Sequence, residues 1–184
     1  MRTSTKALAG AAAVATSGLA AFAASRILTR HPRGNAHVPE PAKSVDLERY
    51  LGHWHEIARY EQRFERGCRA ATADYALYPD GRIEVVNWCR KRNADARQAR
   101  GVARVIDGET NAKLKVRFFG PFEGDYWILD RADDYSWSIV GEPSGRYLWL
   151  LARDPHPAAE QLDSLIARAA ELGYDTSMLV FDTH

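Results

Sequence analysis

The chain has 184 residues, which is room for one domain with an N-terminal appendage and a core of useful size. Its net charge of +1 hides an asymmetry: residues 1–45 hold six basic residues and one acidic residue, which leaves 19 basic against 23 acidic in the remainder. A folded part with excess negative charge argues against nucleic acid as a partner. The five Trp, eight Tyr and six Phe suit either a large core or an apolar binding cavity.

The N-terminus has the pattern of a targeting segment. Arg2 and Lys6 form a short basic region, followed by an uncharged, Ala-rich run with an Ala-x-Ala cleavage site. Residues 1–24 are therefore predicted to be a signal peptide or an N-terminal anchor, with a disordered cytosolic tail as the alternative. The proline-containing residues 25–45 are predicted to be a linker, and residues 46–184 the folded domain.

Short β-rich runs follow one another at regular spacing, separated by turn residues such as Pro79-Asp80-Gly81. This pattern indicates an all-β barrel or sandwich. Eight antiparallel strands joined to their neighbours are the number of a small barrel that holds one ligand. The strands are predicted near 53–60, 70–78, 82–90, 98–106, 112–119, 124–130, 135–141 and 146–152.

A helix is predicted after the last barrel strand, followed by a short final strand at residues 178–181. Gly173 ends the helix. Its apolar stripe has the i, i+3, i+4, i+7 spacing and consists of Leu162, Leu165, Ile166 and Ala169.

Two cysteines, Cys68 and Cys89, flank the hairpin whose turn is at residues 79–81, and their distances from the turn differ by little enough for a bulge to absorb. Export would place them in an oxidising compartment, where an even pair usually bridges. The sequence therefore predicts a Cys68–Cys89 disulfide, with two separate buried thiols as the alternative. A metal site at these cysteines is disfavoured because the chain has no Cys-x-x-Cys and no nearby His pair to complete it.

Two motifs mark the ends of the β-rich region. Gly52-x-Trp54 opens the first strand, and an aromatic and leucine run closes the last strand on Arg153. Between them, in order, lie Ile57-Ala58-Arg59, Phe64-Glu65-Arg66-Gly67 and Phe118-Phe119-Gly120-Pro121-Phe122. Together these motifs resemble the lipocalin family, and within it the bacterial outer-membrane lipoproteins, over roughly residues 46–183.

The resemblance implies an all-β fold: an eight-stranded antiparallel up-and-down β-barrel with one C-terminal helix packed outside. In lipocalins this Trp plugs the closed end of the barrel and the Arg lies against its indole, which assigns those roles to Trp54 and Arg153. The implied function is to store or transport a fatty acid, a lysophospholipid or a similar small lipophilic ligand for cell-envelope maintenance. Location in the periplasm or outer membrane is implied too, whereas membrane association and a homodimer stay open. No cysteine precedes Cys68, so the residue that carries the lipid of such lipoproteins is missing.

Alternation along the strands predicts which side chains face the barrel interior. Taking Trp54 as inward places Glu56 and Ala58 inward too. A carboxylate there must be paired, hydrogen-bonded or protonated, and Arg59 or an interior Tyr would satisfy it; contact with a ligand headgroup is the alternative. For the aromatic side chains, simple core filling is the alternative to lining a cavity. The predicted cavity residues are Glu56, Tyr75, Ile83, Val85, Leu114, Val116, Phe118, Tyr126, Ile128, Tyr147 and Trp149.

A basic run precedes and follows the predicted break between the third and fourth strands. Most such runs are solvated faces, but at the mouth of a barrel this one would attract anionic headgroups. The basic residues are Arg90, Lys91, Arg92, Arg97 and Arg100.

The sequence carries no Gly-x-Ser-x-Gly elbow, no P-loop and no dinucleotide fingerprint, which predicts a protein that is not an enzyme and uses no cofactor or metal. His53 and His55 share the outward face, where a two-His metal clip is the alternative to plain surface histidines. Two functional rivals remain. A lipocalin-fold enzyme acting on a lipid or isoprenoid would need an interior nucleophile, and a chromophore or haem carrier would need an inward His.

Overall fold

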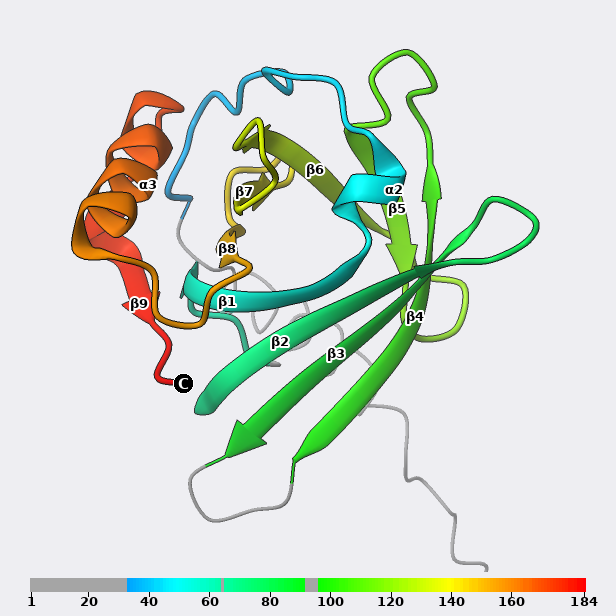
Figure 1. The fold of residues 1–184 in the computed structure, drawn as a ribbon, viewed down its shortest axis with the longest axis horizontal. Coiled ribbons are helices and arrows are strands. Elements are labelled where there is room, and N and C mark those ends of the chain that lie inside the picture. The colour runs from blue at the N-terminus through cyan, green and yellow to red at the C-terminus, as the bar shows by residue number, and fades with distance from the viewer. Residues whose placement is uncertain (1–32, 64, 92–95) are drawn as a thin grey trace, which may run out of the picture. The chain divides into compact units, whose positions relative to one another are not determined.

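The computed structural model describes residues 33–63, 65–91 and 96–184, and the predicted signal segment at residues 1–24 lies outside them. Within these residues the strands run in the order β2-β3-β4-β5-β6-β7-β8-β1-β9, and an additional β1–β2 pairing closes the first eight into an antiparallel barrel (Figure 1). The predicted eight-stranded up-and-down barrel is therefore confirmed. The strands are β1 Gly52–Tyr60, β2 Cys68–Leu77, β3 Ile83–Lys91, β4 Arg97–Val105, β5 Lys113–Arg117, β6 Gly124–Arg131, β7 Trp137–Gly141, β8 Leu148–Ala152 and β9 Leu179–Phe181.

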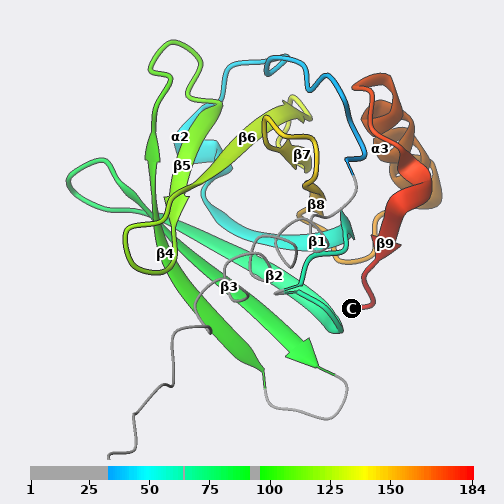
Figure 2. The same cartoon turned by 180° about the vertical axis from the view of Figure 1, so that it is seen from behind.

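Three helical segments accompany the barrel: α2 (Leu47–Tyr50), α3 (Ala159–Glu171) and the 3-10 turn η1 (Thr176–Met178). The helix α3 packs against the outside of the barrel, as Figure 2 shows. Its buried side chains, Leu165 and Ala169, belong to the predicted apolar stripe. No helix among the described residues has the length and apolar character needed to cross a membrane.

The strand β1 changes its neighbours and its faces along its length. Residues 52–55 pair with β2, whereas residues 58–60 pair with β9. On its other edge β1 pairs with β8, and the register shifts between Glu56 and Ala58. Such a shift exchanges the two faces of a strand. Ala58 therefore packs in the outer core under α3, so its predicted inward position is wrong, and Arg59 lies opposite Trp149.

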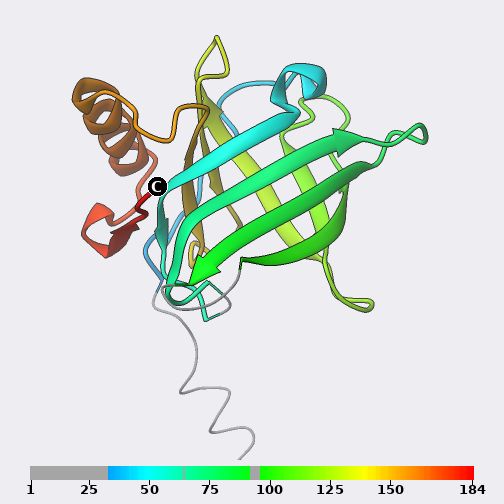
Figure 3. The same cartoon turned by 60° about the horizontal axis from the view of Figure 1, so that its bottom comes forward.

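The two ends of the barrel differ. At one end, which we call the closed end, α2 lies beside the connections β2–β3, β4–β5 and β6–β7. At the other end, which we call the mouth, β1, β3, β5 and β7 terminate (Figure 3). The segment before α2 spans both: the amide of Gly34 donates to the carbonyl of Gly145 in the β7–β8 connection, and the amide of Val45 donates to the carbonyl of Thr110 in the β4–β5 connection.

Candidate ligand cup

Trp54 and Arg153 seal the closed end. Trp54 is fully buried, and its indole Nε1 donates to the carbonyl of Tyr50 at 2.8 Å. The guanidinium carbon of Arg153 lies 3.8 Å from the centroid of the indole ring, a cation–π contact. The same guanidinium donates to the backbone carbonyls of His53 and Leu51, at 2.6 and 2.9 Å, which ties the chain before β1 to the end of β8. The predicted Trp–Arg contact is thus present.

Gly52 opens β1 beside this contact in a backbone conformation that favours glycine. Its φ is +90°, in the left-handed region that side chains rarely adopt, and a Cβ there would meet Nη1 of Arg153 at 3.6 Å. The Gly-x-Trp motif therefore requires glycine for its backbone conformation and tryptophan for its packing.

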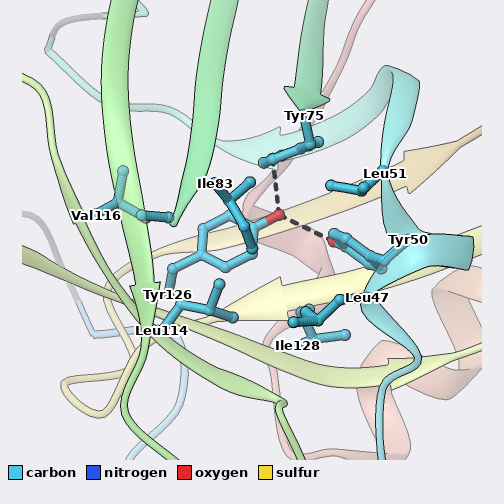
Figure 4. A pocket seen from close by; sticks show the side chains of 10 residues that line it. Leu47, Tyr50, Leu51, Tyr75, Ile83, Leu114, Val116, Tyr126 and Ile128 are labelled. Atoms are coloured by element: carbon cyan, nitrogen blue, oxygen red, sulfur yellow. Dashed lines mark hydrogen bonds between the residues drawn. The ribbon is translucent and has the colours of Figure 1, made fainter. Parts of the chain in front are cut away.

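Three tyrosine hydroxyls meet inside the barrel above the closed end. The hydroxyl of Tyr126 lies 3.0 Å from that of Tyr50 and 2.9 Å from that of Tyr75 (Figure 4). Tyr50 also contacts the hydroxyl of Ser138 at 3.3 Å. Burial raises the pKa of Tyr50 to about 12 and raises the pKa of Tyr75 and Tyr126 as well, so all three are neutral hydrogen-bonding groups. Tyr50 was not predicted as a cavity residue, because α2 has too few residues to show a period.

A cavity of about 10 Å³ lies between these tyrosines and the barrel wall. That volume holds about one water molecule, so the closed half of the barrel is nearly filled by its own side chains. Six of the predicted cavity residues reach it. The lining consists of Leu47, Tyr50, Leu51, Tyr75, Ile83, Ala103, Leu114, Val116, Tyr126 and Ile128.

The other predicted cavity residues lie elsewhere in the interior. Val85 is part of the inner core, and Phe118 and Trp149 pack against it. Tyr147 stacks on Trp149 with 5.8 Å between ring centroids. These residues do not line the small cavity; Phe118 faces the β4–β5 gap, where its ring fills the space that a side chain at Gly101 would occupy.

Glu56 belongs to a buried charged network towards the mouth. Its Oε1 accepts from Nη1 of Arg59 at 2.6 Å, so Arg59 is the partner that a buried carboxylate requires. Arg59 also lies 3.8 Å from the carboxylate of Glu65 and 3.9 Å from that of Asp182. The indole Nε1 of Trp149 donates to Glu65 at 3.2 Å.

This network contains three carboxyl groups and one guanidinium. Burial raises the pKa of Glu56 to about 8 and that of Glu65 to about 7, and in each case a neighbouring carboxylate adds to the effect. The Nε of Arg59 is buried without a hydrogen-bond partner. The interior near the mouth therefore holds more carboxyl groups than one guanidinium can pair, and Glu56 is largely protonated at neutral pH, which separates this region chemically from the closed half.

The cysteines are joined, and the outward histidines are not assembled into a metal site. The Cys68–Cys89 disulfide is present, with a Cα–Cα distance of 5.3 Å. His53 pairs with Asp74 at 2.6 Å, and the ring of His55 lies edge-on to that of His184 with 5.0 Å between centroids. The described residues contain no cluster of His, Cys, Asp and Glu arranged to hold a metal ion.

A closed eight-stranded barrel with a Trp–Arg plug, an aromatic interior and one outer helix defines a protein of the small ligand-binding barrel class. The lipocalin-like domain family matches residues 45–184. The chain therefore belongs to the lipocalin family, as its motifs predicted.

Known relatives place it among bacterial members. The chain is 40% identical over 145 residues to outer membrane lipoprotein Blc of Vibrio cholerae, covering 77% of this chain and 84% of that protein. It is 38% identical to Blc of Escherichia coli K12, over 78% of this chain and 85% of that protein. Temperature-induced lipocalin-1 of Arabidopsis thaliana is also 38% identical, over 76% of this chain and 80% of that protein. Among solved structures, insecticyanin from the tobacco hornworm has a TM-score of 0.68 at 20% identity over 84% of this chain and 90% of that one, a likeness of fold.

Proposed function

We propose that this lipocalin binds a single-chain lipid, a fatty acid or a lysophospholipid, and stores or transports it in the cell envelope. The observation that carries the proposal is the continuous aromatic and aliphatic interior beneath a charged network near the mouth. Such an interior suits an acyl chain, and the network suits a polar headgroup. The Blc relatives, whose names describe outer membrane lipoproteins, support export to the envelope.

Binding requires the interior to open. Lipid-sized pockets measure several hundred Å³, and the cavity of about 10 Å³ at the closed end is far smaller. Tyr126 is the side chain best placed to move, because its two hydrogen-bond partners are neutral hydroxyls that water can replace. We therefore expect a ligand to displace Tyr126 and to enlarge the cavity that Tyr75 and Leu114 line.

The charged network near the mouth bears on which lipid headgroup the cup would accept. A fatty-acid carboxylate beside Glu65 would add negative charge to a network that already has three carboxyl groups against one guanidinium. The ammonium of a lysophospholipid would instead offset it. Of the two lipid classes, the lysophospholipid is the one that the network favours.

Binding rather than catalysis is the activity that the interior supports. Both cysteines are in the disulfide, so the described residues offer no free thiol as a nucleophile. A haem or chromophore carrier would need an inward histidine, whereas His53 is exposed and pairs with Asp74, and the ring of His55 lies against that of His184.

The first prediction tests the cup by a charge on its wall. Val116 lines the cavity and is 8% exposed, so Val116→Asp should bury an unpaired charge beside the acyl chain. We expect the affinity for lysophosphatidylcholine and palmitate, measured by tryptophan fluorescence, to fall more than about a hundredfold. Wild type should bind lysophosphatidylcholine more tightly than palmitate.

The matched control makes the same chemical change on the outer face. Val102 lies opposite Arg117 in the β4–β5 pairing and opposite Glu84 in the β3–β4 pairing, so Val102→Asp places the new carboxylate between a guanidinium and a carboxylate at the surface. Binding by this variant should stay near that of wild type. Circular dichroism must show both barrels folded. Equal loss in both variants, or no binding by folded wild-type protein, would exclude the cup and favour a packed barrel with a surface function.

A further inference from the structure

The β5–β6 connection carries two exposed aromatic side chains at the mouth. Phe119 is 74% exposed and Phe122 is 82% exposed, the two highest values among the large apolar side chains described. Gly120 between them has a φ of +55°, which turns the chain back at the tip. Figure 3 shows this loop projecting beyond the barrel at the end where β3 terminates and β4 begins. Exposed Phe side chains that are adjacent at a loop tip favour an apolar partner.

Basic side chains surround this end of the barrel. Arg69 lies directly opposite Arg90 in the β2–β3 pairing, and like charges placed opposite each other destabilise a sheet. Arg97 and Arg117, at the mouth ends of β4 and β5, are exposed, and none of these four guanidiniums has an ion-pair partner within the described parts of the chain. This clustering of positive charges destabilises the fold unless a negatively charged surface binds there and neutralises it.

A groove of about 310 Å³ lies on the outer face of the barrel at the base of the aromatic loop, and Tyr78 and Glu84 of the β2–β3 hairpin form part of its wall. It is lined by Arg100 and Arg117 on the outer face of the barrel and by Phe118 and Gly120 at the base of the aromatic loop. Arg100 is held by Glu84 at 2.9 Å, whereas Arg117 faces the groove from the strand that leads into the loop. The groove thus places the side chain of Arg117 at the base of the aromatic loop.

The described chain also begins at this end. The amides of Gly34 and Asn35 both donate to the carbonyl of Gly145, in the connection between β7 and β8. Thirty-two residues precede Arg33, and they include the basic and uncharged run predicted to be a signal or anchor.

From these observations we propose that the mouth of the barrel docks on an anionic lipid bilayer. Phe119 and Phe122 enter the interfacial region, and the guanidiniums of Arg69, Arg90 and Arg117 contact lipid phosphates. A second copy of the chain is a poorer occupant, because it would bring the same positive charges face to face. Docking in this orientation would present the cup to the membrane that supplies its lipid. It does not require the cup to bind lipid, so this proposal and the proposed function can fail separately.

The experiment uses the full chain and vesicles of phosphatidylcholine with or without phosphatidylglycerol. The Phe119→Ser/Phe122→Ser variant should lower the partition coefficient on phosphatidylglycerol vesicles by about tenfold or more in co-sedimentation. The Arg69→Gln/Arg90→Gln variant should lower it by about fivefold for each charge removed, and only on the anionic vesicles at low salt. The control is Ile106→Ser, which removes an apolar side chain that is 43% exposed at the closed end and should bind like wild type.

A second readout separates docking of the mouth from attachment through residues 1–33. Vesicles with brominated acyl chains should quench the added emission of Phe122→Trp but not that of Ile106→Trp. Equal quenching of both, or a partition coefficient unchanged by both loop and Arg variants, would overturn the proposal. So would light scattering that shows Phe119→Ser/Phe122→Ser converting a dimer to a monomer, because the loop would then be an interface between copies.

Discussion

The closed half of the barrel and its mouth half are built from the same strands but differ in how well their polar and charged groups are paired. In the closed half the polar groups of the plug have partners: the Trp54 indole, the tyrosine hydroxyls and the Arg153 guanidinium all form hydrogen bonds. In the mouth half three carboxyl groups share Arg59, whose Nε has no partner, and Arg69 faces Arg90. Departures from local stability rules gather where a protein binds or reacts. We therefore expect the closed end to contribute most to stability and the mouth to carry the proposed binding.

The largest expected effect is at the closed end. Trp54→Ala should lower the free energy of unfolding by about 3–5 kcal/mol, because a fully buried indole leaves a cavity that the surrounding β-strands cannot collapse to fill. Urea unfolding followed by circular dichroism measures it. An equal truncation at the mouth, Phe122→Ala, removes an 82% exposed ring and should change stability by less than about 0.5 kcal/mol.

A double-mutant cycle locates the source of that stability. Arg153→Ala should cost less than Trp54→Ala, and the two should couple by about 1 kcal/mol because the guanidinium lies 3.8 Å over the indole. Strictly additive losses would mean that the contact contributes nothing and that Arg153 acts only through its hydrogen bonds to backbone carbonyls.

The same division explains what the sequence could and could not predict. The closed half follows from local patterns: alternation placed Leu114 and Val116 inward, and the Gly-x-Trp motif located the plug. The mouth half depends on a register shift in β1, which the alternation of polar and apolar residues does not predict. The bulge between Glu56 and Ala58 moved Ala58 outward and Arg59 inward, which assembled a network with Glu65 of the β1–β2 connection and Asp182 of the distant C-terminal segment. The filling of the cavity was also beyond sequence reasoning, because it depends on rotamers of Tyr50 and Tyr126.

The disulfide gives an intermediate effect at the mouth. Cys68 and Cys89 are separated by 21 positions, and in the chain-entropy model cross-linking a loop of that size contributes about 3 kcal/mol. Cys68→Ser/Cys89→Ser should lower the free energy of unfolding by about that amount. In hydrogen exchange the amides of β2 and β3 near the mouth should lose protection, while those of β1 near Trp54 should lose little. Uniform loss across the barrel would show that the two halves unfold as one unit. Native protein from an oxidising compartment should show no alkylatable thiol.

The effect most specific to the mouth is a dependence of stability on pH. Burial raises the pKa of Glu56 to about 8 and that of Glu65 to about 7, against about 4.3 for an unfolded Glu. The folded state therefore binds more protons than the unfolded state between these values, so stability is greatest at low pH within this window. It falls as pH rises towards 8, with a slope of up to about 1.4 kcal/mol per pH unit for each proton.

His55, whose pKa burial lowers, acts with the opposite sign below about pH 6.5, so the informative quantity is a difference between variants. Glu56→Gln keeps the shape of the side chain and can still accept from Arg59, but it cannot ionise. Its free energy of unfolding, measured in urea from pH 5 to pH 8, should lose part of the downward slope and exceed that of wild type at pH 8. Glu61→Gln, at an exposed position in the β1–β2 connection, serves as the control and should keep the wild-type slope. Parallel pH profiles for wild type and Glu56→Gln would show that Glu56 is ionised in the folded protein throughout, and that Arg59 compensates the network fully. In that case the mouth would be as well satisfied as the closed end, and the contrast between the two halves would rest on the surface charges of Arg69 and Arg90 alone.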